Sequence, residues 1–278
     1  MKNMKNKIKI SFVFAVLALG LLLGGCKKYL DKAPEATVNE KDAFKDFRSF
    51  QGFTEELYSC IVDPSKSTYQ TDFNLADEFI SNASYFVSRR MDDGNYWAWQ
   101  WAYGSYFGSS SNAVVTNPTS PYGKVVWPLA WYGIRKANLG LANMDKLVNA
   151  TQEEKDIIKG QLLFFRGYFY HELMINWGGM PYIDKVLSPT EEMKFPRLNY
   201  RETALKAASD LEQAAQLLPL KWDDTEAGKP TLGNNRQRIS KITAYAFLGK
   251  DLLYAASPLM NRESTGIAGY DADLCKKA

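Results

Sequence analysis

Apolar residues recur at intervals of three and four along four stretches of this chain, and this spacing constrains the fold more than any other feature. Residues so spaced lie on one face of an α-helix, so each stretch is expected to bury one stripe. The stretches form two neighbouring pairs, 127–149 with 152–176 and 201–218 with 238–256. The sequence therefore predicts a mainly α fold built from helix hairpins. The stripe residues are Ala130, Ile134, Ala137, Leu141, Met144 and Val148; Ile158, Leu162, Phe165, Phe169 and Leu173; Ala204, Ala207, Ala208, Leu211, Ala214, Ala215 and Leu218; and Ile239, Ile242, Ala246, Gly249, Leu253 and Ala256.

The second stretch also carries signals for its two ends. Thr151 and Glu154 have the spacing of a capping box, in which each side chain bonds the backbone N–H of the other residue. Gly178-Gly179, with Pro181 just beyond, predicts the end of the helix. Alanine and glycine on the inward stripes would let helix axes approach closely, as in stacked tetratricopeptide-type hairpins. An irregular helical bundle is the alternative, because no strict repeat length is present.

The N-terminus has the pattern of a secretory leader. Four lysines precede an apolar run from Ile10 to Leu23, which as a helix would be about 21 Å long and too short to cross a bilayer comfortably. The run ends in Leu23-Gly24-Gly25-Cys26, which resembles the bacterial lipobox. We therefore predict a lipoprotein signal peptide at 1–25 and a membrane anchor of acyl chains on Cys26. A secreted protein with an incidental cysteine is the alternative.

Composition excludes several classes of function. The chain has 34 basic and 31 acidic residues, and the leader takes four lysines, so the remainder is nearly neutral and is not expected to bind nucleic acid. Besides Cys26 there are two cysteines, Cys60 and Cys275, which could pair or be ordinary small apolar residues. One histidine, His171, is most simply a helix residue with a hydrogen-bond partner. We find no nucleophile elbow, phosphate-binding loop or zinc motif, so no enzyme activity, metal or cofactor is predicted.

The segment 62–126 is rich in Ser, Asn, Gly and aromatic residues and has little periodicity, so it is expected to be loop-rich. Within it, "NYWAWQWAY" (95–103) is the stretch most typical of a binding site. An indole ring offers a flat apolar surface that can stack on the C–H face of a sugar, and nearby polar groups can orient the ligand. The alternative is that these rings are buried in the core. The candidate ligand-binding residues are Tyr96, Trp97, Trp99 and Trp101, with Asp77 and Arg89.

Five stretches, in this order, resemble the SusD/RagB family of outer-membrane nutrient-binding lipoproteins. They are "CKKYLDKAPE", "WPLAWYGIRKANLGLANMDKL", "KGQLLFFRGYFYHELMINWGGMPYI", "ALKAASDLEQAAQLLP" and "KITAYAFLGKDLLYAASPL". The resemblance implies a tetratricopeptide-like scaffold and ligand-binding residues in the segment before the helix hairpins. Members of this family are usually longer, so we expect 26–278 to be a SusD-like α-helical domain that is truncated at its C-terminus.

The same resemblance implies capture of a glycan or another nutrient at the surface of the outer membrane. The partner that it implies is a SusC-type TonB-dependent transporter, to which the ligand is delivered. Two other functions remain open from the residues alone. One is a surface scaffold or adhesin whose aromatic residues are all core, and the other is a lipid-anchored glycoside hydrolase. The hydrolase needs two carboxylates held across a glycosidic bond, and no such constellation is evident in the sequence.

Overall fold

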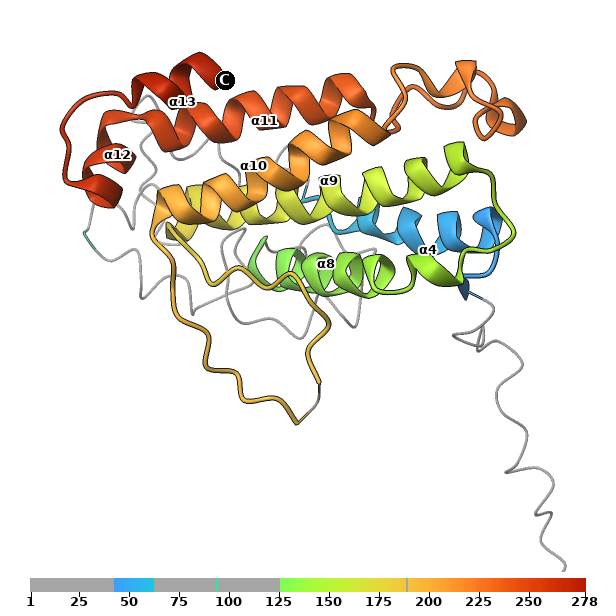
Figure 1. Ribbon diagram of the computed structural model, residues 1–278, viewed down its shortest axis with the longest axis horizontal. Helices are drawn as coiled ribbons and strands as arrows, with labels where there is room; N and C mark the ends of the chain where they lie inside the picture. Colours follow the sequence, from blue (N-terminus) through green and yellow to red (C-terminus); the bar gives the residue numbers. More distant parts are fainter. Residues whose placement is uncertain (1–42, 63–93, 95–125, 189) are drawn as a thin grey trace, which may run out of the picture. The chain divides into compact units, whose positions relative to one another are not determined.

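A computed structural model of the chain describes residues 43–62, 94, 126–188 and 190–278 (Figure 1). In these ranges the regular structure is helical, apart from one isolated parallel bridge between Asp46 and Asn149. The helices are α4 (Phe47–Ser59), α8 (Val126–Leu141), α9 (Gln152–Trp177), α10 (Tyr200–Leu217), α11 (Lys241–Ala256), α12 (Pro258–Thr265) and α13 (Ala272–Lys277), with short 3-10 turns η3 (Met144–Lys146), η4 (Trp222–Asp224) and η5 (Lys229–Thr231).

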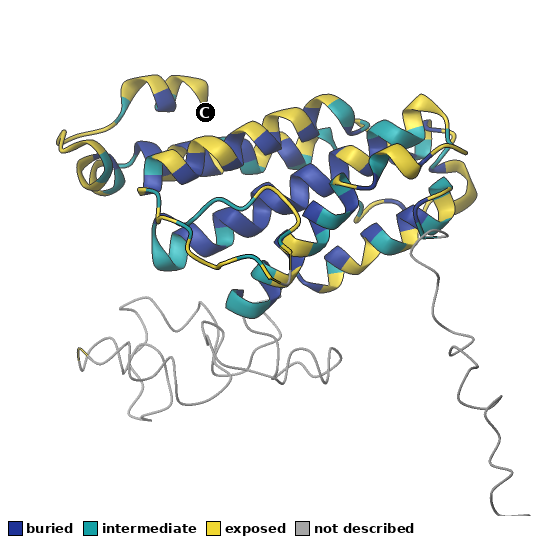
Figure 2. Ribbon diagram, turned by 60° about the horizontal axis from the view of Figure 1, so that its bottom comes forward, coloured by how far each residue is buried: buried dark blue, intermediate teal, exposed yellow. Residues whose placement is uncertain are grey.

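The helices pack in the order of the chain, and α9 lies at the centre. Helix α8 packs on α9, α9 on α10, and α10 on α11, while α4 lies against both α8 and α9 (Figure 1). Because α9 has neighbours on several sides, nearly every residue from Ile157 to Met174 is buried (Figure 2). This succession of helix hairpins confirms the predicted mainly α, tetratricopeptide-like fold.

Small residues bring the helix axes close together, as the sequence suggested. On α8, a Cβ added to Gly133 would lie 2.2 Å from the ring of Phe169, so α9 occupies the space where a side chain would be. On α9, a Cβ added to Gly167 would lie 2.8 Å from Cγ of Leu211 and 3.0 Å from the carbonyl oxygen of Ala207. Both interfaces of α9 therefore exclude even a methyl group at these positions.

The predicted ends of α9 are confirmed. Thr151 caps the helix and forms the full capping box with Glu154, whose carboxylate accepts from the Thr151 backbone N–H at 2.8 Å. At the other end, Gly178 has a φ of 80°, a conformation that favours glycine. The N–H of Gly178 donates to the carbonyl oxygen of Met174 at 2.9 Å. The same reciprocal cap opens α10, where Asn199 and Glu202 play the two roles.

The prediction that the first helix runs to residue 149 is wrong. Helix α8 ends at Leu141 and is followed by the 3-10 turn η3. The side-chain amide of Asn143 donates to the carbonyl oxygen of Leu139 at 2.7 Å, which satisfies a last-turn carbonyl and ends the helix. Val148, expected on the inward stripe, is consequently 69% exposed.

The inward face predicted for the last helix is wrong in its middle part. Ile239 and Ala256 are buried as predicted, but Ile242, Ala246 and Leu253 are exposed. Helix α11 instead buries Ala244, Leu248, Leu252 and Ala255. The predicted stripe failed because α11 is apolar around much of its circumference, so the spacing of apolar residues did not define one face. Gly249 is only half-buried, and the nearest atom to an added Cβ is the carbonyl oxygen of Ala278 at 3.2 Å.

Two further features concern the cysteines and the possibility of a membrane-spanning helix. Cys60 is buried at the end of α4 and Cys275 lies half-buried on α13, and no disulfide joins them. In the described ranges, no helix combines the length and apolar character needed to cross a bilayer.

Candidate functional site

The site residues predicted from the sequence lie outside the described part of the chain. They fall within residues 1–42, 63–93 and 95–125. Lipidation and ligand binding at these positions therefore remain predictions. The described residues contain the scaffold that follows the aromatic segment, and two cavities in that scaffold. The positions concerned are Cys26, Asp77, Arg89, Tyr96, Trp97, Trp99 and Trp101.

Three indole rings connect the start of α8 to the end of α9. The ring of Trp127 packs edge-on against Trp131, with centroids 5.8 Å apart, and against Trp177, with centroids 5.0 Å apart. Trp127 and Trp131 are partly buried and pack against the core. Edge-to-face pairs of this kind add stability beyond the area they bury.

A buried ion pair joins α9 to α10. The Arg166 guanidinium donates from Nε to Oδ2 of Asp210 at 2.6 Å and from Nη2 to Oδ1 at 2.7 Å. Both residues are less than a tenth exposed. Burial disfavours the cation, but the hydrogen bonds and charge of Asp210 outweigh this effect and raise the pKa of Arg166 above its ordinary range. The bidentate geometry is the strong form of this interaction.

The same ion pair holds the connection between α9 and α10. Arg166 Nη1 donates to Oδ1 of Asn138 on α8 at 2.9 Å and to the carbonyl oxygen of Asp184 at 3.3 Å. The hydroxyl of Tyr182 donates to Asp210. Burial and the charge of Asp210 raise the pKa of Tyr182 well above its ordinary value, so the hydroxyl stays protonated and remains a donor. Side chains of three helices thus fix one segment of loop.

This fixed loop forms one wall of a cavity of about 230 Å³, which we call the Trp131 cavity. Trp131 and Ile134 of α8 line one side, and Ile183, Leu187 and Met193 of the loop line the other. Apolar walls with a few polar groups are typical of small-ligand sites, although most such sites are larger. The charged lining residues are Arg135 and Lys185.

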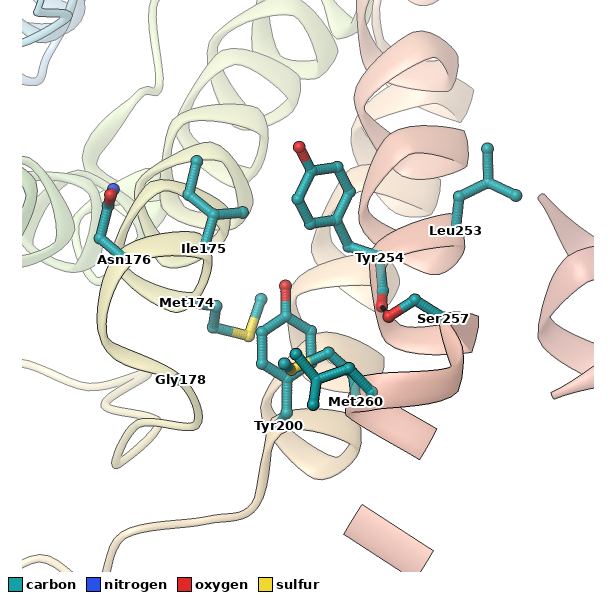
Figure 3. A pocket seen from close by; sticks show the side chains of 10 residues that line it. Met174, Ile175, Asn176, Gly178, Tyr200, Leu253, Tyr254, Ser257 and Met260 are labelled. Carbon is teal, nitrogen blue, oxygen red and sulfur yellow. Dashed lines mark hydrogen bonds between the residues drawn. The ribbon is translucent and has the colours of Figure 1, made fainter. Parts of the chain in front are cut away.

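A second cavity, of about 660 Å³, opens between α9, α10 and the α11–α12 corner, and we call it the Tyr200 cavity. Figure 3 shows Met174, Tyr200 and Met260 close together, with Tyr254 of α11 facing Ile175 of α9. Flexible thioethers and aromatic rings make this lining mostly apolar and adaptable.

A second buried pair, between α9 and α11, lies near Tyr200. His171 Nδ1 and Asp251 Oδ1 are 2.9 Å apart, and both side chains are fully buried, which confirms that His171 is a helix residue with a hydrogen-bond partner. Burial raises the pKa of Asp251, and the hydrogen bond from His171 offsets part of that effect. Three buried atoms here have no hydrogen-bond partner within the described residues: His171 Nε2, Asp251 Oδ2 and the Tyr200 hydroxyl.

Neither buried pair was predicted as a pair from the sequence. Arg166 interrupts the apolar run "LLFFRGYFY" of α9, and Asp251 interrupts the apolar residues of α11. A charged residue inside such a run must be paired if the helix is buried on all sides. A charged residue within an apolar run could have identified Arg166 and Asp251 as paired residues, but this pattern could not have identified their partners.

Comparison with known proteins identifies the scaffold. The model of a SusD-like family, described as starch-binding associating with outer membrane, matches residues 28–253. SusD-like protein P2 of Formosa agariphila is 30% identical over 126 residues, which are 44% of this chain and 22% of that protein. A SusD-like protein of Bacteroides fragilis shares the fold, with a TM-score of 0.55 and 22% identity over 81% of this chain and 38% of that one. A SusD homologue of Bacteroides thetaiotaomicron does so with a TM-score of 0.57 and 16% identity over 82% of this chain and 40% of that one.

The chain thus spans about two fifths or less of the length of these relatives. The identities to the two solved structures are low enough that those structures support the fold alone. The family model, however, covers most of the residues, from the start of the predicted mature chain into α11. The chain therefore belongs to the SusD-like family.

Proposed function

We propose that this protein is a cell-surface lipoprotein that binds a glycan, or another nutrient, and delivers it to a SusC-type TonB-dependent transporter in the outer membrane. The observation that carries the proposal is the match of the SusD-like family model to residues 28–253. The succession of helix hairpins around α9 is consistent with it, because stacked hairpins form extended surfaces suited to a large partner.

The proposed ligand surface is the aromatic stretch 95–103, assisted by Asp77 and Arg89. Indole rings stack on the apolar faces of sugars, and a carboxylate and a guanidinium can bond sugar hydroxyls. The test is to change Trp97, Trp99 and Trp101 to alanine one at a time, and to measure both thermal unfolding and retention on insoluble polysaccharide. A platform residue loses retention with little loss of stability, whereas a core tryptophan costs about 3–5 kcal/mol on truncation.

Three mutants that all lose stability, with none losing retention specifically, would eliminate the platform. We also expect binding without turnover. A reducing-sugar assay on the purified chain checks this, and hydrolysis that disappears when a carboxylate is changed would favour the lipid-anchored hydrolase instead.

The anchor is tested separately. We expect Cys26→Ala to move the protein from the membrane fraction to the soluble fraction, because each buried methylene of an acyl chain contributes about 0.8 kcal/mol of membrane affinity. Labelled palmitate should be incorporated into the wild type and not into the variant. Absence of label from the wild type would exclude the anchor and leave an ordinary secreted protein.

A further inference from the structure

The Trp131 cavity has the size of a site for one ring. Its volume is about 230 Å³. Typical ligand sites are about 300–1,000 Å³, so an oligosaccharide would not fit inside and a single ring would.

The cavity wall is held in place by buried contacts. The side-chain amide of Asn138 donates to the carbonyl oxygens of Ile183 at 2.8 Å and Lys185 at 3.1 Å. Its own carbonyl oxygen accepts from Arg166, and Asn138 is only 2% exposed. The part of the wall at Ile183 and Lys185 is therefore fixed before a ligand binds, which reduces the cost of ordering the loop.

The charged groups that line the cavity are cationic. Lys185 pairs with Glu191 at 2.5 Å, so its charge is partly neutralised. The Arg135 guanidinium is exposed and, within the described ranges, forms no ion pair or hydrogen bond. A cation at an apolar cavity that also holds a partly buried indole favours a ligand with an anionic group attached to a flat apolar face.

We propose that the Trp131 cavity binds a single pyranose ring that carries a carboxylate, as in a uronic acid. Trp131 supplies the apolar surface for the C–H face of the ring, and Arg135 supplies paired N–H donors whose geometry matches a carboxylate. This inference rests on the proposed function, because it names the class of sugar that a glycan-binding chain takes at described residues that were not among the predicted ligand-binding residues.

The test uses two probes that differ only at C6, methyl β-glucuronide and methyl β-glucoside. Their affinities for the purified chain are measured by ligand-observed NMR. We expect the glucuronide to bind about twofold to fivefold more tightly, as one exposed charge contact allows. The preference should shrink when salt is raised from about 0.02 M to about 0.5 M, because an exposed contact is screened.

Arg135→Gln should abolish this preference and its salt dependence while leaving glucoside affinity unchanged. Arg236→Gln is the matched control, since Arg236 is also exposed but lies in the connection before α11 and does not line the cavity. Trp131→Leu, checked for folding by circular dichroism, should weaken both probes. Equal affinities for the two probes, or a preference that survives Arg135→Gln, would overturn the inference.

Retention on insoluble polysaccharide reports the proposed function independently. A chain that is retained but shows no glucuronide preference would refute the acidic-sugar site and leave the proposed function standing. A chain that is neither retained nor binds either probe would refute both.

Discussion

Helix α9 forms a buried polar pair with each of two neighbouring helices, Arg166 with Asp210 of α10 and His171 with Asp251 of α11. The two pairs differ in how many of their polar atoms have a hydrogen-bond partner. Towards α10, Arg166 and Asp210 form a bidentate pair to which Asn138 and Tyr182 add further hydrogen bonds. Towards α11, His171 makes a single 2.9 Å contact with Asp251, and within the described residues the other ring nitrogen and the other carboxylate oxygen have no hydrogen-bond partner. Burial disfavours charge in both places, but only the first contact is fully compensated.

The difference indicates separate roles for the two interfaces. The satisfied pair fixes a loop, and that loop forms a wall of the Trp131 cavity, so the α9–α10 interface specifies one geometry. Within the described residues, no hydrogen bond connects the His171–Asp251 pair to a loop. Its surroundings are the aromatic rings of Phe247 and Tyr254, whose centroids lie 6.2 and 5.5 Å from that of His171. The α9–α11 interface is therefore the one whose stability should depend on protonation.

The largest effect should come from breaking the satisfied pair. Arg166→Met leaves Asp210 as a buried carboxylate without its cation, and we expect a loss of about 3–5 kcal/mol in the free energy of unfolding. Urea denaturation of the purified variant and wild type measures it. The double variant Arg166→Met/Asp210→Leu should recover much of the loss, since it removes the uncompensated charge. A loss below about 1 kcal/mol in the single variant would show that this pair is not buried in solution.

The sequence predicted the helices better than it predicted these contacts. The capping box at Thr151 and the glycine end at Gly178 are local signals, and both predictions were right. The face of α11 depends on which neighbour it meets, and apolar residues around the helix hid that choice. The partner of Arg166 is 44 positions away, so no local pattern could identify it. The aromatic candidates for ligand binding lie outside the described residues, so they stay a prediction.

A smaller effect is expected from crowding the α9–α10 interface beside that pair. In Gly167→Ala the new methyl group would meet Leu211 and the carbonyl oxygen of Ala207 at 3.0 Å or less. We expect a loss of about 1–3 kcal/mol through overpacking. Gly249→Ala on α11 is the control, because its nearest contact is 3.2 Å and alanine favours a helix by about 1 kcal/mol. Equal unfolding midpoints for the two variants would mean that the interfaces are equally open.

The contribution of the His171–Asp251 pair to the free energy of unfolding should depend on pH. Burial raises the pKa of Asp251 above its ordinary 3.8. A carboxyl whose pKa is raised by folding contributes stability that is complete below the unfolded value and is lost as pH rises through the folded value. Asp251→Asn keeps an acceptor for His171 and cannot ionise. We therefore expect the unfolding free energy of the variant to rise relative to that of the wild type as pH increases from about 4 to 8. A difference in unfolding free energy that stays constant with pH would contradict this expectation.

The smallest effect should come from removing a tyrosine hydroxyl. The same atom can be removed beside each buried pair, so this test compares the two interfaces most directly. Burial, with the charge of Asp251 next, raises the pKa of Tyr200, so its hydroxyl stays protonated. Tyr200→Phe removes a buried polar group that has no hydrogen-bond partner among the described residues, so stability should be unchanged or rise by up to about 1 kcal/mol. Tyr182→Phe is the matched control. Its hydroxyl donates to the Asp210 carboxylate, and losing a hydrogen bond to a charged group typically costs about 1.5–3 kcal/mol. Urea unfolding of both variants at one pH decides the comparison, and a Tyr200→Phe loss as large as that of Tyr182→Phe would show that the α9–α11 interface is as fully hydrogen-bonded as the α9–α10 interface.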